Sequence, residues 1–254
     1  MITFASQFYE SDGVRMRYFT AGAGAPLLFL HGGGVRAMTY RRNLESFARD
    51  FFVIAPDVPP FGASSMPPAE WDFINYADYL SGFVESRGLE KLTVSGHSFG
   101  GGIAFCLAAR SSRVGRLVLV DAAGVSLPPL PLFFTRFFAV KALHNLSASI
   151  PLTLKMEADF IANVAQKLPQ VVHGIRIILR AMKPQYREEF AKITVPTLIL
   201  WGTEDELFPL KDAHELGATI PGSRTELIPG NHDWCLFRPE LLSDYIGRFV
   251  YSEK

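Results

Sequence analysis

The fold assignment rests on the segment Leu92-Thr-Val-Ser-Gly-His-Ser-Phe-Gly-Gly-Gly-Ile-Ala-Phe-Cys-Leu-Ala-Ala109. An apolar strand over Leu92–Ser95 runs into Gly96-His-Ser-Phe-Gly100, and a helix of small residues follows. Gly-x-Ser-x-Gly between a strand and a helix puts the serine on a sharp, strained turn, because the glycines let neighbouring backbone approach without a Cβ clash. The pattern predicts Ser98 as an outward-pointing nucleophile beside a helix N-terminus that favours an oxyanion.

On both sides of this segment, short apolar runs alternate with longer segments of helical period, which is typical of parallel strands joined by helices. Near-continuous apolar runs such as Leu117–Val120 indicate strands that are covered on both faces. We therefore predict an α/β protein with a mostly parallel, doubly covered sheet of about eight strands. The strands that can be assigned are Arg15–Thr20, Leu27–Leu30, Phe52–Ala55, Leu92–Ser95, Leu117–Val120, Thr197–Trp201 and Thr225–Ile228. The expected helices are Thr39–Arg49, Ile74–Arg87, Phe99–Arg110, Leu210–Thr219 and Pro239–Val250.

The alternation breaks between Ala123 and Ile193. Leu127-Pro-Pro-Leu-Pro-Leu132 is expected to block regular structure, and helical periodicity without a strand follows it. We predict a core domain formed by residues 1–124 and 190–254 and a helical cap, or lid, inserted at 125–189. Phe133 and Phe137 on this cap are candidates for contact with substrate, and packing of the cap onto the core is an equally good explanation for them.

Composition narrows the class of ligand. Lysine plus arginine and aspartate plus glutamate number 25 each in 254 residues. That balance favours neither nucleic acid nor an acidic membrane surface, and it indicates a small, largely neutral substrate. The sequence offers neither a signal-peptide pattern nor a run of about 18 apolar residues, so we expect a cytoplasmic protein without a membrane span. We expect a monomer or homodimer.

The two cysteines, Cys106 and Cys235, are too few for a disulfide framework and lack metal-ligand spacing. We expect free buried thiols and no metal.

A second glycine-rich segment, His31-Gly-Gly-Gly34, directly follows the strand Leu27–Leu30. Glycines at this place let backbone amides face inward and stabilise an oxyanion. We predict that Gly33 supplies one oxyanion-hole amide and Phe99 the other, with Gly34 as the alternative donor and a candidate for substrate contact. The segment lacks a Gly-Lys-Ser/Thr ending and the glycine spacing of dinucleotide sites, which argues against phosphate binding.

Serine needs a base that titrates near neutral pH, and histidine is the natural choice. His232, in Pro229-Gly-Asn-His-Asp233, lies in a loop after the last expected strand, where loops converge above a sheet. His97 is a poor base because adjacent side chains on a tight turn point apart; we expect it in the pocket wall or in a structural role. Trp234, beside the base, is a further candidate for substrate contact.

The orienting carboxylate should follow another strand and precede the base. Asp205 meets both conditions, in Leu200-Trp-Gly-Thr-Glu-Asp-Glu-Leu-Phe-Pro209. Glu204 and Glu206 are close rivals. Asp121, at the end of the preceding strand, is a weaker alternative.

Together these motifs resemble the α/β-hydrolase superfamily from His31 to His232. Asp57-Val-Pro-Pro-Phe-Gly-Ala-Ser64 is similar to its aspartate-proline-glycine turn, with Pro60 where glycine is usual. The resemblance implies nucleophile, acid and base at Ser98, Asp205 and His232, and no cofactor. Serine at position 98 disfavours haloalkane dehalogenases and epoxide hydrolases, which use aspartate there.

Hydrolysis of an apolar carboxylic ester is the first functional hypothesis, because the insertion is rich in phenylalanine. The second is carbon–carbon bond hydrolysis, since His31–Gly34 followed by Tyr40-Arg-Arg-Asn43 is similar to meta-cleavage-product hydrolases. Arg176 or Arg180 would then bind a substrate carboxylate. Such enzymes usually have asparagine in place of His97 and tryptophan in place of Asp233. The third hypothesis is a non-catalytic receptor for a small apolar ligand.

Overall fold

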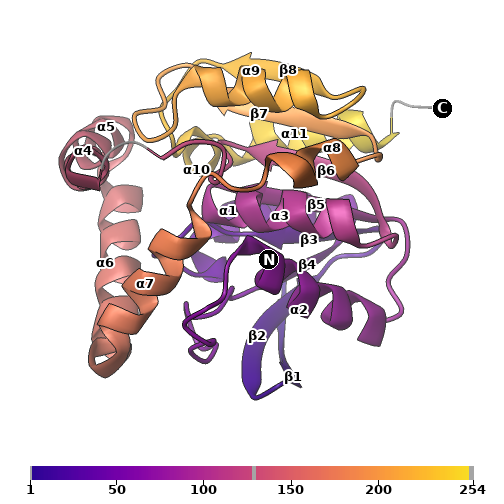
Figure 1. Ribbon diagram of the computed structural model, residues 1–254, viewed down its shortest axis with the longest axis horizontal. Helices are drawn as coiled ribbons and strands as arrows, with labels where there is room; N and C mark the ends of the chain where they lie inside the picture. The colour runs from indigo at the N-terminus through magenta and orange to yellow at the C-terminus, as the bar shows by residue number, and fades with distance from the viewer. Residues whose placement is uncertain (1, 128–129, 252–254) are drawn as a thin grey trace.

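The computed structural model describes residues 2–127 and 130–251, leaving out the side chains of Leu130, Phe133, Phe134, Phe137, Phe138 and Val171. Its centre is an eight-stranded sheet in the order β1-β2-β4-β3-β5-β6-β7-β8 (Figure 1). The first two strands are antiparallel to their neighbours, and the others pair in parallel. This arrangement confirms the expected mostly parallel sheet.

All seven strands assigned from the sequence are present. The strands are β1 (Ala5–Ser11), β2 (Val14–Ala21), β3 (Ala25–Leu30), β4 (Phe51–Pro56), β5 (Leu92–His97), β6 (Val114–Val120), β7 (Thr197–Gly202) and β8 (Arg224–Ile228). The strand that could not be assigned is β1, an edge strand with mostly exposed side chains and therefore without an apolar pattern. Asp12 and Gly13, both with positive φ, join it to β2 in a tight hairpin.

Both faces of the sheet are buried, as the apolar strands indicate. On β3, Leu27 and Phe29 belong to one hydrophobic cluster, whereas Leu28 and Leu30 belong to the other. Side chains alternate along a strand, so a strand that is apolar at every position must be covered twice. The helices that contribute to the first cluster include α1 (Arg41–Phe47), α10 (Trp234–Phe237) and α11 (Pro239–Tyr251). Those that contribute to the second include α2 (Phe73–Ser86), α3 (Phe99–Arg110), α8 (Arg187–Lys192) and α9 (Leu210–Thr219).

The helix expected over Thr39–Arg49 is a short 3₁₀ helix, η1 (Ala37–Tyr40), followed by α1. No side chain caps α1, and Tyr40 forms the junction between the two pieces.

Between β6 and β7 the described residues form helices and no strand. These are α4 (Leu130–Thr135), η2 (Arg136–Val140), α5 (Lys141–Ala148), α6 (Ile150–Gln166), η3 (Leu168–Gln170) and α7 (Val171–Ala181), followed by α8. Figure 1 shows α4 to α7 grouped along one side of the core, and we call these helices the cap; the expected domain boundaries at 125 and 189 stay a prediction. The proline-rich segment Leu127–Leu132 was expected to lack regular structure, but α4 already begins at Leu130. Proline is tolerated in the first turn of a helix, where its missing N–H is not needed.

Within the described residues, no helix has both the length and the hydropathy that crossing a bilayer requires.

Candidate active site

Ser98 lies between the end of β5 and the start of α3, on backbone that few non-glycine residues adopt. Its φ of 54° and ψ of −118° mark a strained turn. A Cβ on Gly96 would lie 2.2 Å from the Gly100 carbonyl oxygen, and one on Gly100 would lie 2.2 Å from the Leu30 carbonyl oxygen. Only glycine therefore fits at positions 96 and 100.

The loops that follow β7 and β8 bring Asp205 and His232 together. Nδ1 of His232 lies 2.8 Å from Oδ2 of Asp205, and both side chains are buried. The other carboxylate oxygen accepts hydrogen bonds from the backbone amides of Leu207 and Phe208, which fix the orientation of the carboxylate. Burial lowers the pKa of His232, but the charge and hydrogen bond of Asp205 outweigh burial, so this pKa lies above its ordinary value.

The rival carboxylates have other partners. Glu204 is exposed, and Glu206 accepts the backbone amide of His232 at 3.2 Å. Asp121 is fully buried and accepts the amide of Gly202 and the indole N–H of Trp234. Burial and the charge of Asp205 raise the pKa of Asp121 well above its usual range.

Ser98 and His232 approach the same region from different loops. The ring of His97, the residue before the serine, lies 4.9 Å from the His232 ring, measured between centroids. Phe208 contacts the His232 ring edge-on and lines the same cavity as Ser98. No hydrogen bond joins Ser98 to His232 among the described residues, so the hydroxyl–imidazole contact remains a prediction. Such bonds often tighten only when substrate is bound.

The two amides expected to form an oxyanion hole come from neighbouring residues. A Cβ on Gly33 would lie 3.4 Å from the Phe99 Cβ, and both residues line the cavity. In the described chain neither backbone amide has a hydrogen-bond acceptor. His31 braces this loop: its Nδ1–H donates to the Gly32 carbonyl, and its Nε2 accepts the Val58 amide. The oxyanion-hole role of Gly33 and Phe99 stays a prediction.

Neither His97 nor Trp234 is among the described residues that line the cavity, which corrects the expected substrate contact of Trp234 and leaves His97 with the structural role that was its alternative. Both are buried, and Trp234 donates its indole N–H to Asp121. His97 donates Nε2–H to the backbone oxygen of His232, and its Nδ1 accepts the hydroxyl proton of Tyr40. Burial, aided by His232, lowers the pKa of His97 to about 3, so the ring is neutral near pH 7. Adjacency in sequence to the nucleophile and base did not bring these side chains into the cavity.

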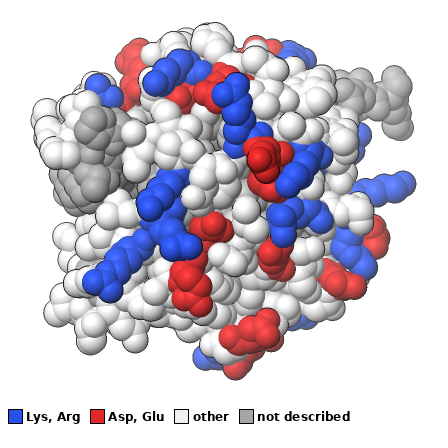
Figure 2. Space-filling model, in the orientation of Figure 1, with Lys and Arg blue, Asp and Glu red and all other residues white. Residues whose placement is uncertain are grey.

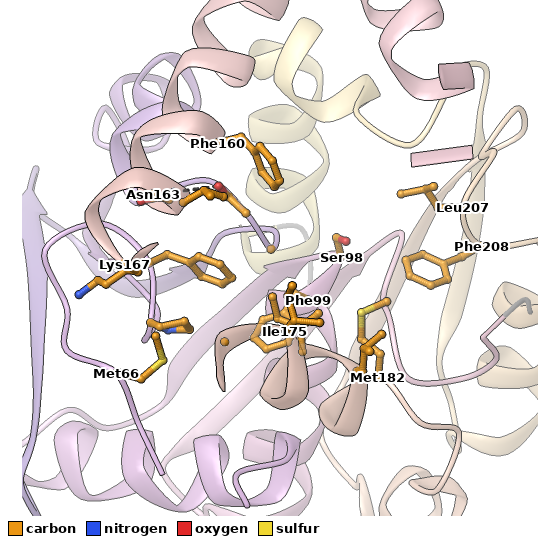
Figure 3. Close-up of a pocket in the computed structure, with 18 residues that line it drawn as sticks. Met66, Ser98, Phe99, Phe160, Asn163, Lys167, Ile175, Met182, Leu207 and Phe208 are labelled. Carbon is orange, nitrogen blue, oxygen red and sulfur yellow. Dashed lines mark hydrogen bonds between the residues drawn. The ribbon is translucent and has the colours of Figure 1, made fainter. Parts of the chain in front are cut away.

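Ser98 opens onto a cavity of about 220 Å³ between the core and the cap (Figure 3). Phe160 and Asn163 of α6 lie on one side, Ile175 and Met182 come from the α7 region, and Phe208 lies opposite. The wall is formed by Gly33, Gly34, Pro60, Phe61, Met66, Ser98, Phe99, Phe160, Asn163, Val164, Lys167, Gly174, Ile175, Ile178, Leu179, Met182, Leu207 and Phe208. Gly34 lines the cavity, and its contact with substrate stays a prediction. Phe133 and Phe137 belong to α4 and η2, but their side chains lie outside the described residues.

The cavity wall is apolar apart from Ser98 and two cap residues. Asn163 is buried, accepts the Gly62 amide and donates to the Gly34 carbonyl, so it ties the cap to the core. The ammonium of Lys167 donates to the Ser64 carbonyl and points away from Ser98 (Figure 3). Arg176 and Arg180 are exposed and do not line the wall. The cap residues that line the cavity were missed in the sequence, where α6 has only an ordinary amphipathic pattern.

Two groups of potential metal ligands occur in the described chain: His97, His232 and Asp233, and Asp121, Asp205 and His232. Hydrogen bonds within the protein already engage both nitrogens of His97 and both oxygens of Asp121. In the described chain these residues are therefore already bound to protein partners.

The sequence from 25 to 239 matches the family model for the α/β-hydrolase fold. The chain belongs to this family. Among curated proteins, it is 28% identical over 284 residues to an uncharacterised protein of Mycobacterium tuberculosis, covering 96% of this chain and 80% of that one. It is also 28% identical over 249 residues to the 2-hydroxy-6-oxo-6-(2′-aminophenyl)hexa-2,4-dienoic acid hydrolase of Metapseudomonas resinovorans, covering 92% and 86% of the two chains.

Among solved structures, the fold is similar to an esterase of Exiguobacterium antarcticum. The TM-score is 0.80 at 22% identity, with 98% of this chain and 99% of that chain covered. The molecule is therefore an α/β hydrolase with similarity both to esterases and to meta-cleavage-product hydrolases.

Proposed function

We propose that this α/β hydrolase cleaves carboxylic esters of small apolar substrates through an acyl-enzyme intermediate. The observation that carries the proposal is Ser98, which sits on a strained turn and opens onto an apolar cavity. A buried histidine–carboxylate pair lies in the neighbouring loops. The face in Figure 2 has acidic and basic residues intermixed, which suits a substrate without strong charge.

In the proposed reaction, Ser98 Oγ attacks the ester carbonyl carbon while Nε2 of His232 takes the hydroxyl proton. Asp205 holds the ring by Nδ1 and stabilises the imidazolium. The amides of Gly33 and Phe99 donate to the oxyanion. His232 then gives its proton to the leaving alcohol. Water, activated by the same imidazole, cleaves the acyl-enzyme and releases the acid.

Carbon–carbon bond hydrolysis is the second candidate, favoured by the Metapseudomonas relative. Its substrates are carboxylates, so a cation should face the cavity. The arginines considered for that role are exposed, and the Lys167 ammonium bonds to a backbone carbonyl. An ester with no charged group fits this wall better.

The test is a panel of aryl esters of graded acyl length assayed beside a vinylogous diketo acid. We expect turnover of esters, with Ser98→Ala as the inactive control. Faster turnover of the diketo acid would favour carbon–carbon cleavage. Stoichiometric binding without turnover would favour the receptor hypothesis.

We also propose a cytoplasmic location, which is supported by two cysteines that are buried and unpaired.

A further inference from the structure

One face of the cap helix α5 meets the loops that carry the acid–base pair. Lys141, His144 and Asn145 are spaced i, i+3 and i+4, so they share a side of the helix. All three have partners next to Asp205 or His232 in sequence, namely Glu206, Asn231 and Asp233. A single turn of the cap therefore contacts both loops.

The strongest of these contacts flank the base. Lys141 Nζ lies 2.9 Å from Asp233 Oδ2, and Asn145 Nδ2 donates to the same oxygen at 2.6 Å. On the other side of His232, Asn231 Nδ2 donates to Asn145 Oδ1 at 2.7 Å. Asn145 and Asp233 are almost completely buried. Asn145 thus joins the residues before and after the base.

A weaker contact reaches the acid loop. His144 Nδ1 lies 3.8 Å from Glu206 Oε2, the oxygen that accepts the His232 amide. The backbone amide of His232 therefore donates to Glu206, while the next residue, Asp233, is held by Asn145.

We propose that Lys141 and Asn145 are positioning residues through which the cap sets the orientation and proton affinity of His232; this inference rests on the role of His232 in the proposed function. Asn145 fixes the loop, and Lys141 neutralises the carboxylate that stands next to the base. Neither residue lines the cavity, so both act through His232 and not through substrate.

The effect of Lys141 on the pKa of His232 depends on the other charges nearby. The charged or titratable groups that face the ring or its loop are Asp205, Asp121, Glu206, His97, Asp233 and Lys141. Burial is the largest influence on Asp233 and raises its pKa, but the charge of Lys141, the rings of His232 and His97 and the hydrogen bond from Lys141 together lower that pKa to about 2. Asp233 raises the pKa of His232, and Lys141 lowers it. Removing the charge of Lys141 should therefore raise the pKa of His232, and removing the charge of Asp233 should lower it.

The experiment combines Lys141→Gln, Asp233→Asn and the double variant. Lys141→Gln should raise the pKa of His232 by about one unit, and Asp233→Asn should lower it by a similar amount. The double variant should return near the original value, because the two charges that it removes shift the pKa of His232 in opposite directions; the double-mutant cycle then measures how strongly the two residues are coupled. Lys141→Arg should retain the original pKa. Lys155→Gln is the matched control, because this cap lysine contacts Asp159 and the Met38 carbonyl instead of the base loop.

NMR titration of His232 in the full chain measures the pKa without turnover, so it tests this inference even if no ester is cleaved. Where an ester is cleaved, the acid limb of kcat/KM should shift with the NMR value. Lys141→Gln and Asn145→Ala should lower kcat by roughly tenfold or more with KM unchanged. Shifts of the same sign in the two single variants, or an equal shift in Lys155→Gln, would overturn the proposal. So would a change confined to KM.

Discussion

Asp205 holds His232 through one carboxylate oxygen and two backbone amides through the other. In Asp205→Asn the side-chain oxygen can keep the amides, but its NH₂ group then faces Nδ1 and selects the wrong imidazole tautomer. We expect kcat to fall by about 10⁴ with the fold unchanged, measured as steady-state ester hydrolysis.

Glu204→Gln is the control for this change, since Glu204 is the neighbouring carboxylate and is exposed. It should have full activity. If Asp205→Asn were also fully active, the orienting role would move to Asp121, the other carboxylate near His232.

Ser98→Ala should remove the nucleophile and leave the turn intact, because alanine and serine have similar access to positive φ. Turnover is expected to fall by about 10⁴ to 10⁶. Thermal unfolding of the variant should match that of the unmodified protein. Retention of most activity would show that another group attacks the substrate.

Gly100→Ala should destabilise the protein strongly, because its Cβ would lie 2.2 Å from the Leu30 carbonyl oxygen, which belongs to a central strand. We expect a loss of about 3 kcal/mol or more in the free energy of unfolding by urea. Gly247→Ala on α11 is the matched control, since a Cβ there meets nothing within 4 Å. It should stabilise the helix by up to about 1 kcal/mol. Equal effects of the two changes would contradict the close approach at Gly100.

Acid should destabilise the protein through His97. Its pKa is about 3 in the fold, against about 6.5 in an unfolded chain. Between these values the unfolded chain binds one more proton, so stability present above pH 6.5 is lost as the pH falls toward 3. The expected slope is about 1.4 kcal/mol per pH unit from this residue.

His97→Asn isolates that contribution, because asparagine can donate to the His232 carbonyl and accept from Tyr40 without titrating. The free energy of unfolding by urea, measured between pH 4 and pH 6, should then depend less steeply on pH. The slope should be smaller by about 1.4 kcal/mol per pH unit, which corresponds to one proton. His31, whose pKa burial also lowers, remains in both proteins and cancels from the difference. An unchanged slope would mean that His97 is already protonated in the folded protein.

The parts of the fold that the sequence predicts are those that depend on local pattern. The helix Phe99–Arg110 and the glycines beside Ser98 were recognisable because a tight strand-to-helix turn restricts its own residues. The edge strand Ala5–Ser11 was not, since its side chains are mostly exposed. Asp12-Gly13 was the available signal for it.

The roles of buried polar residues could not be predicted, because they depend on partners far away in sequence. His97 is engaged by Tyr40, Trp234 by Asp121, and Asp233 by Lys141. Proximity to the nucleophile or base in sequence gives no information on such pairings. The contact between Asp205 and His232 was predictable only because strand ends converge at one edge of a parallel sheet.

The hydrogen bonds from Gly32 to Tyr40, from Tyr40 to His97 and from His97 to the His232 backbone form one buried chain behind the reacting atoms. Because this chain contributes nothing to the cavity wall, residues such as Ile175 and Met182 can be replaced without touching it. Laboratory evolution toward bulkier or smaller acyl groups should therefore succeed first at the cap side of the wall.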